Sequence, residues 1–142
     1  MANYYATARS NYFAVKDEAA FRAWAGNLGL TVLEPDHRAK STDGIRRFGI
    51  APGNNGDSGA WPAHVWDDET TDYTEIDLTA QLAPHLGDGE VAVLMEVGHE
   101  ALRYVTGSAV AVNASGRTVS IDLGSIYRTA GKLGPNLTRA EY

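Results

Sequence analysis

The chain has 142 residues, a net charge of −6 and no cysteine. This length suits one domain, and the lack of cysteine excludes disulfides, zinc-thiolate sites, iron–sulfur clusters and cysteine nucleophiles. No apolar run approaches the roughly 18 residues of a transmembrane helix. The first residues lack the basic start and apolar stretch of a signal peptide. We therefore expect a cytoplasmic protein that does not contact a membrane.

Aromatic and β-branched residues near the N-terminus predict a strand over 3–15. Tyr4 and Tyr5 should lie on opposite faces of it, because side chains alternate along a strand. Asp17 precedes an apolar stripe at helical spacing, so we expect it to cap a helix over 18–28. The following part of the chain should hold short strands over 30–33, 45–50 and 64–66. The last of these lies within a Gly-rich and then acidic loop region over 51–77.

Leucines at every fourth position predict a helix over 79–86, shortened or kinked by Pro84. A three-strand meander should follow, with its last turn at 113–116 and its strands over 90–97, 102–112 and 118–123. An apolar stripe then predicts a helix over 126–133, which Gly134 and Pro135 end.

These elements predict one α+β domain over 1–142. It should contain an antiparallel sheet of about five or six strands, with two or three helices packed on one face. The alternation of the strands and the stripes of the helices select the residues expected in the core. They are Phe21, Trp24, Leu28, Leu82, Val91, Val93, Met95, Val110, Val112, Ile121, Ile126 and Leu133.

Charge is distributed unevenly along the chain. Residues 1–47 carry a net charge of +2 and residues 103–142 carry +3, whereas residues 48–102 hold eleven acids and no Lys or Arg. One interpretation is a solvated face that aids solubility. The other is an acidic surface that docks on a basic partner or imitates nucleic-acid phosphates. Exposed aromatic residues are typical anchors of such an interface. The candidate partner-binding residues are Asp67, Asp68, Glu69, Asp72, Glu75, Trp61 and Trp66.

An alternative interpretation starts from aromatic and basic residues near the N-terminus, a combination typical of single-strand nucleic-acid binding. Its candidate residues are Tyr4, Tyr5, Arg9, Arg46 and Arg47.

Catalytic and metal-binding motifs are missing. The four histidines have no metal-ligand spacing, and the Gly-rich stretch 49–59 lacks the Lys-Ser/Thr pair of a phosphate-binding loop. The acidic run 67–77 lacks the glycine and the final glutamate of an EF-hand loop. We therefore expect no enzyme activity, no cofactor and no metal.

Two segments, NYYATARSNYFAVKDEAAFRAW and EIDLTAQLAPHLGDGEVAVLMEVGHEALRYVTGSAVAVNASG, resemble small proteins encoded by phages, plasmids and integrated elements. The resemblance implies a mobile-element accessory protein, and anti-CRISPR or anti-restriction inhibition is common in that setting. We therefore hypothesise a non-enzymatic protein whose acidic surface binds the basic surface of a host nucleic-acid-handling defence complex. We do not expect it to bind nucleic acid directly, although a small nucleic-acid-binding accessory protein stays as the alternative.

Overall fold

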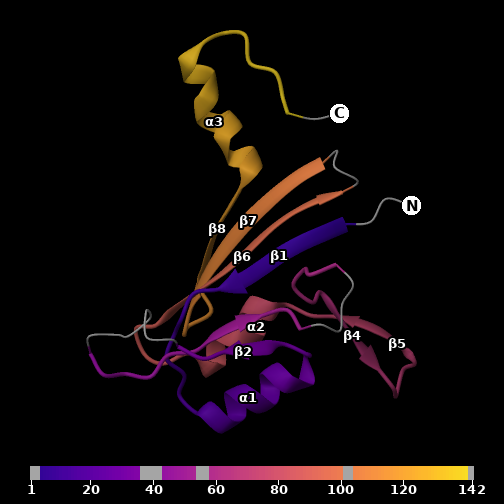
Figure 1. Cartoon of the computed structure of the whole chain (residues 1–142), viewed down its shortest axis with the longest axis vertical. Coiled ribbons are helices and arrows are strands. Elements are labelled where there is room, and N and C mark those ends of the chain that lie inside the picture. Colours follow the sequence, from indigo (N-terminus) through magenta and orange to yellow (C-terminus); the bar gives the residue numbers. More distant parts are fainter. Residues whose placement is uncertain (1–3, 36–42, 54–57, 101–103, 141–142) are drawn as a thin grey trace.

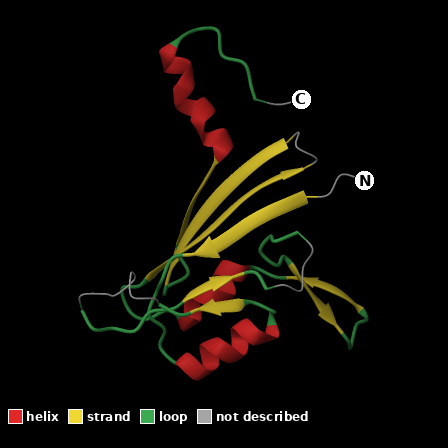
Figure 2. Cartoon of the chain, in the orientation of Figure 1, coloured by secondary structure: helices red, strands yellow, loops and turns green. Residues whose placement is uncertain are grey.

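Figures 1 and 2 show a computed structural model of the chain, in which residues 4–35, 43–53, 58–100 and 104–140 are described. The strands are β1 (Tyr4–Ser10), β2 (Thr31–Leu33), β3 (Gly49–Ala51), β4 (His64–Asp67), β5 (Asp72–Glu75), β6 (Val91–Glu100), β7 (Tyr104–Asn113) and β8 (Thr118–Asp122). The α-helices are α1 (Glu18–Asn27), α2 (Leu78–Leu82) and α3 (Tyr127–Ala130). Short 3₁₀ segments are η1 (Ala83–His85), η2 (Leu123–Ile126) and η3 (Gly131–Leu133). The predicted α+β class is confirmed.

Four antiparallel strands form the main sheet in the order β1-β6-β7-β8. Its register places Thr7 beside Val97, Val97 beside Gly107, and Ala109 beside Ile121. Because side chains alternate along each strand, these residues share one face, called the outer face here. Their neighbours in sequence point to the inner face. Tyr4 and Tyr5 lie on opposite faces, as predicted.

The core lies where the inner face meets α1, α2 and the two-stranded β2–β3 sheet. Phe21 on α1 is fully buried, and its ring packs edge-on against Phe13 at 5.8 Å and tilted against Phe48 at 6.2 Å. The main sheet contributes Leu94 and Val112 to the same cluster. Only one end of the sheet is thereby covered, and the other end extends away from the helices (Figure 1).

Local signals placed the two covering helices correctly. Asp17 caps α1 by accepting a hydrogen bond from the Ala20 amide at 3.1 Å, and Leu28 is the C-cap. Asp77 caps α2 in the same way. Pro84 lies in η1, so the α-helix tightens into a 3₁₀ turn there, as the missing backbone donor predicts.

The strands are distributed differently from the expectation of one sheet with five or six of them. The described residues form a four-stranded sheet and two separate pairs, β2–β3 and β4–β5. The expected first strand ends at Ser10, and beyond it only Phe13 and Val15 form isolated bridges. Within 45–50, only Gly49 and Ile50 enter a named strand. Strand β5 forms inside the expected acidic loop, and β6 continues to Glu100, beyond the end expected at residue 97.

The predicted core needs two corrections. Met95, Val91 and Ile121 are exposed, because they belong to the outer face, while Ala92 and Leu94 are buried in their place. Ile126 and Leu133 are exposed as well. Their helical segment follows β8 away from the body of the molecule and does not pack on the sheet with α1 and α2 (Figure 2).

Candidate protein-binding hairpin

Strands β4 and β5 form an antiparallel hairpin that protrudes from the body of the molecule (Figure 1). Trp66 and Tyr73 face each other across it, with their rings in an edge-to-face arrangement at 5.1 Å. Half of Trp66 and two thirds of Tyr73 remain exposed (49% and 65%). Exposed aromatic pairs of this kind bring large apolar area to an interface at low entropic cost.

The hairpin that carries this aromatic pair also carries five carboxylates. Asp67 and Asp72 are paired directly across the two strands, and Asp68, Glu69 and Glu75 complete the set. Like charges that face each other in a sheet are destabilising, so this pairing does not serve the stability of the hairpin. None of the five carboxylates forms an ion pair within the described parts of the chain. Their charge is therefore available to a partner.

Hydrogen bonds hold the hairpin tip in a defined shape. The Trp66 Nε1 donates to Asp68 Oδ1 at 2.8 Å, and the Glu69 amide donates to Asp67 Oδ1 at 2.9 Å. Thr71 closes the turn with a positive φ of 52°, a conformation that costs energy for a residue with a β-branched side chain. The acidic side chains and the indole are thus presented in a fixed arrangement.

The base of the hairpin leads directly into α2. The Ile76 amide donates to the Ala63 carbonyl across the hairpin at 2.9 Å, and Asp77, the next residue, caps α2. The hydroxyl of Thr79 donates to Asp77 and lowers the pKa of that carboxyl, as does the Ala80 amide. Asp77 therefore has a structural role, unlike the five carboxylates farther out.

A shallow hollow of about 560 Å³ lies between the hairpin and the two helices. Leu28, Val65 and Ile76 supply apolar surface to it, whereas Gln81 and the carboxylates of the hairpin supply polar atoms. Such a site suits a long basic side chain. The methylene groups of the basic residue would pack on the apolar surface, and its cationic head would meet carboxylates or the Trp66 ring.

Trp61, the remaining residue of the predicted partner-binding set, does not belong to the hairpin. Its backbone amide donates to Glu96 Oε1 at 2.8 Å, and its Nε1 donates to the Met95 carbonyl at 3.2 Å. The ring packs against the core. Nearby, Gly59 adopts a φ of 75° and lies against the Ala6 carbonyl so closely that a Cβ atom would come within 2.1 Å of that oxygen. The end of the Gly-rich loop is thus docked on β1.

The residues of the alternative, nucleic-acid-binding set are dispersed. Tyr4 and Tyr5 point to opposite faces of β1, and Arg9 lies over the Tyr12 ring. Arg47 is held by Asp43 and Glu90 at 2.9 and 2.7 Å. The structure does not bring these five residues together on one surface.

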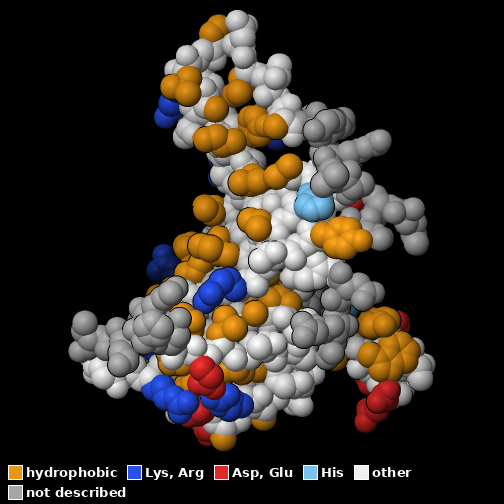
Figure 3. Space-filling model, viewed as in Figure 1, with side chains coloured by type: hydrophobic (Ala, Val, Ile, Leu, Met, Phe, Trp, Pro, Cys, Tyr) orange, Lys and Arg blue, Asp and Glu red, His pale blue; other side chains and the backbone are white. Residues whose placement is uncertain are grey.

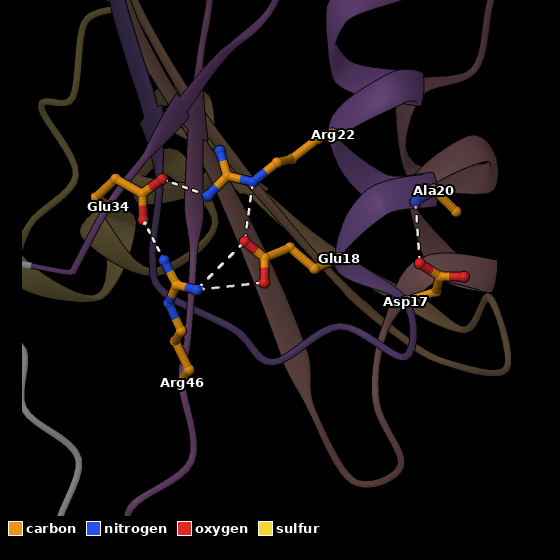
Figure 4. A network of polar contacts seen from close by, with 6 residues as sticks. All are labelled: Asp17, Glu18, Ala20, Arg22, Glu34 and Arg46. Atoms are coloured by element: carbon orange, nitrogen blue, oxygen red, sulfur yellow. Dashed lines mark hydrogen bonds and ion pairs between the residues drawn. The ribbon is translucent and has the colours of Figure 1, made fainter.

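Arg46 belongs to a ring of alternating charges that Figure 4 shows. Glu18 binds Arg22 at 3.0 Å and Arg46 at 3.3 Å, and Glu34 binds both arginines from the other side. Both guanidinium groups also lie over the Phe48 ring, at 5.1 and 4.8 Å from its centre. The arginine Arg22 lowers the pKa of Glu34. This network covers the core. Its carboxylates pair with the positive charge of Arg46, which the alternative function needs for binding nucleic-acid phosphates.

No group of three or more His, Asp and Glu side chains within the described residues is arranged to hold a metal ion. None of the helices among these residues is long and apolar enough to span a membrane. Comparison with family models, with curated proteins and with solved structures gives no match for this chain.

The sequence singled out most of the hairpin's candidate side chains but not their arrangement. It missed Tyr73 as a partner for Trp66, since β5 was expected to be an acidic loop. The alternation of Tyr73 and Glu75 with Asp72 and Thr74 was the available signal, although four residues give a weak one.

Proposed function

We propose that this protein is a non-enzymatic binding protein whose β4–β5 hairpin docks on a basic surface of another protein. The observation that carries the proposal is the exposed Trp66–Tyr73 pair, on a hairpin that also carries five carboxylates with no ion-pair partner within the described residues. Carboxylates of this kind steer a basic partner toward the hairpin, and a desolvated aromatic anchor slows its release.

The setting of this interaction follows from the resemblance of two segments to accessory proteins of phages and plasmids. In that setting the basic surface belongs to a host nucleic-acid-handling defence complex in the cytoplasm. A basic channel that normally holds nucleic acid would accept the acidic hairpin in place of phosphates. The protein would then act as a competitive inhibitor of the complex.

The first test uses a fluorescent nona-arginine peptide as the basic probe, and oligonucleotides of single- and double-stranded DNA and RNA as the competing class of ligand. Anisotropy should show binding of the peptide that weakens as salt is added, because ions screen exposed charges within a Debye length of about 10 Å at 0.1 M. The oligonucleotides should not bind. Binding of oligonucleotides without binding of the peptide would overturn the proposal.

Two variants and their controls locate the binding on the hairpin. Asp67→Asn, Asp68→Asn and Glu69→Gln together keep the hydrogen-bond acceptors of the tip but remove three charges, so the peptide should bind at least tenfold more weakly. The control is Asp88→Asn with Glu100→Gln, which removes two acids outside the hairpin. Trp66→Ala should also weaken binding, whereas Tyr104→Ala, at an equally exposed tyrosine, should not. Equal losses in variants and controls would indicate that the hairpin serves solubility only.

A further inference from the structure

The outer face of the main sheet is an open apolar surface. Seven large apolar or aromatic side chains on it are exposed: Tyr5, Val91, Met95, Val97, Val105, Val119 and Ile121. Arg9 is the one charged side chain that the four described strands place on this face. Figure 3 shows hydrophobic side chains gathered along the sheet and on into the C-terminal segment. A contiguous apolar patch of this kind marks an interaction surface.

Residues 123–140, called the arm here, form a second open apolar surface. Leu123 lies over Gly107 on the outer face, so closely that a Cβ atom at Gly107 would be 3.0 Å from the Leu123 Cγ. Beyond it the arm leaves the sheet (Figure 1), and Leu133 is 93% exposed although it continues the apolar stripe of Ile126.

The described residues leave most of the arm's apolar stripe uncovered, with Ile126 60% and Leu133 93% exposed. Its tail returns to Tyr127, whose hydroxyl accepts a hydrogen bond from the Ala140 amide at 2.6 Å, and Arg139 lies over the Tyr127 ring. The helical part extends only from Leu123 to Leu133, in three short segments. Isolated helices of fewer than about 12 residues are marginal in water. Such a helix needs an apolar surface to pack against.

The arm also differs in net charge from the rest of the chain. The arm holds Arg128, Lys132 and Arg139 and no acid, a net charge of +3, against −9 for the remainder of the chain. Long-range attraction therefore favours the approach of one copy's arm to another copy's body, while the outer face itself offers apolar contact and no acid. The arm's own chain directs it away from the sheet, so the surface must come from another molecule.

A hollow of about 550 Å³ on the outer face offers a seat for side chains of the arm. Tyr5, Val97, His99 and Val105 line it, and Leu123 forms one edge. The Nδ1 atom of His99 is buried, and it has no hydrogen-bond partner among the described residues. An apolar hollow that holds one buried polar atom without a hydrogen-bond partner is typical of a surface that another molecule covers.

We propose that a second copy of this chain covers the outer face with its arm, and that the exchange is reciprocal. In a two-fold dimer each chain supplies one arm and one face, so the same contact occurs twice. This doubling helps the contact reach the total of about 1,000 Å² that a stable interface requires. The surface is separate from the β4–β5 hairpin, so the proposal is independent of the function proposed above.

Sedimentation velocity over a range of protein concentrations tests the proposal on the full chain. The wild type should form a dimer. The arm variant Ile126→Ser with Leu133→Ser and the face variant Val97→Ser with Val105→Ser should each weaken dimerisation at least tenfold. The control Ile45→Ser removes an exposed apolar side chain outside both surfaces and should change nothing. Circular dichroism confirms that each variant is folded.

Mixing the two variants distinguishes arm exchange from other modes of association. A mixed pair has one intact arm facing one intact face, so the mixture should contain a heterodimer that neither variant forms alone. Direct packing of face on face would be disrupted in the face variant but not in the arm variant, and this result would overturn the proposal. A wild type that stays monomeric at high micromolar concentration would also overturn it.

Discussion

Leu94 and Met95 are neighbours on β6 but lie on opposite faces of the sheet, and their replacement by alanine should have unequal effects. Leu94 is 4% exposed and packs in the core, whereas Met95 is 55% exposed on the outer face. Leu94→Ala loses the transfer free energy of a buried side chain and leaves a cavity, which together cost about 2–5 kcal/mol. Met95→Ala loses less than half of a side chain's burial and leaves no enclosed cavity. Its cost should therefore be about 1 kcal/mol or less.

Urea unfolding followed by circular dichroism measures both values, at low micromolar concentration so that self-association contributes little. The midpoint should fall strongly for Leu94→Ala, and the slope of the transition should stay constant for both variants. In a thermal melt, a loss of about 3 kcal/mol corresponds to a lower Tm by about 10 °C for a chain of this size.

The reasoning would be refuted if Met95→Ala proved as destabilising as Leu94→Ala at this concentration. That result would mean that β6 presents its other face to the core, because a shift by one residue exchanges the two sets of side chains. A larger effect of Met95→Ala that appears only at high protein concentration would instead support the dimer.

Two further predictions concern Trp24 on α1 and Glu90, the residue before β6. Trp24 stacks on Phe21 and His85 and donates its Nε1 to Gln81 at 3.0 Å, so Trp24→Ala should cost about 2–4 kcal/mol in the same urea assay, and no loss would contradict the packing of α1. Glu90 accepts hydrogen bonds from Arg47 and from a backbone amide, and the contact with Arg47 lowers the pKa of Glu90. The charged Glu90 therefore stabilises the fold above the ordinary glutamate pKa. This stabilisation is lost as the pH falls through the lowered pKa. Glu90→Gln should therefore lower stability by about 1–3 kcal/mol at neutral pH, and the difference from wild type should shrink in acid; a difference independent of pH would show that the charge of Glu90 is irrelevant.

Local signals determined much of this protein. Asp17 and Asp77 cap the helices that the apolar stripes predict, and Pro84 ends α2 through its missing donor. The alternation of β6, β7 and β8 and the turn after Asn113 predicted the meander, since neighbouring strands pair through short connections. These features depend on residues a few positions apart, so the sequence expresses them directly.

The sequence also determined the charge of the hairpin, though not its geometry. The lack of Lys and Arg over 48–102 is visible without any structure. Whether those acids would be neutralised depended on residues far away in the chain. The tertiary structure gives Glu90 to Arg47 and engages Glu96 through Tyr4 and Trp61, but it leaves the five hairpin carboxylates without a described ion-pair partner.

Which face of the sheet is covered was decided by tertiary structure alone. Val91, Val93 and Met95 form as apolar a series as Ala92 and Leu94, so alternation could not show which series enters the core. The choice depends on where α1 and α2 pack, and they cover the side that carries Ala92 and Leu94. The sequence could not show what covers the arm either. Its apolar stripe at Ile126 and Leu133 predicts a buried helix, but such a stripe does not indicate which surface, or which molecule, buries it.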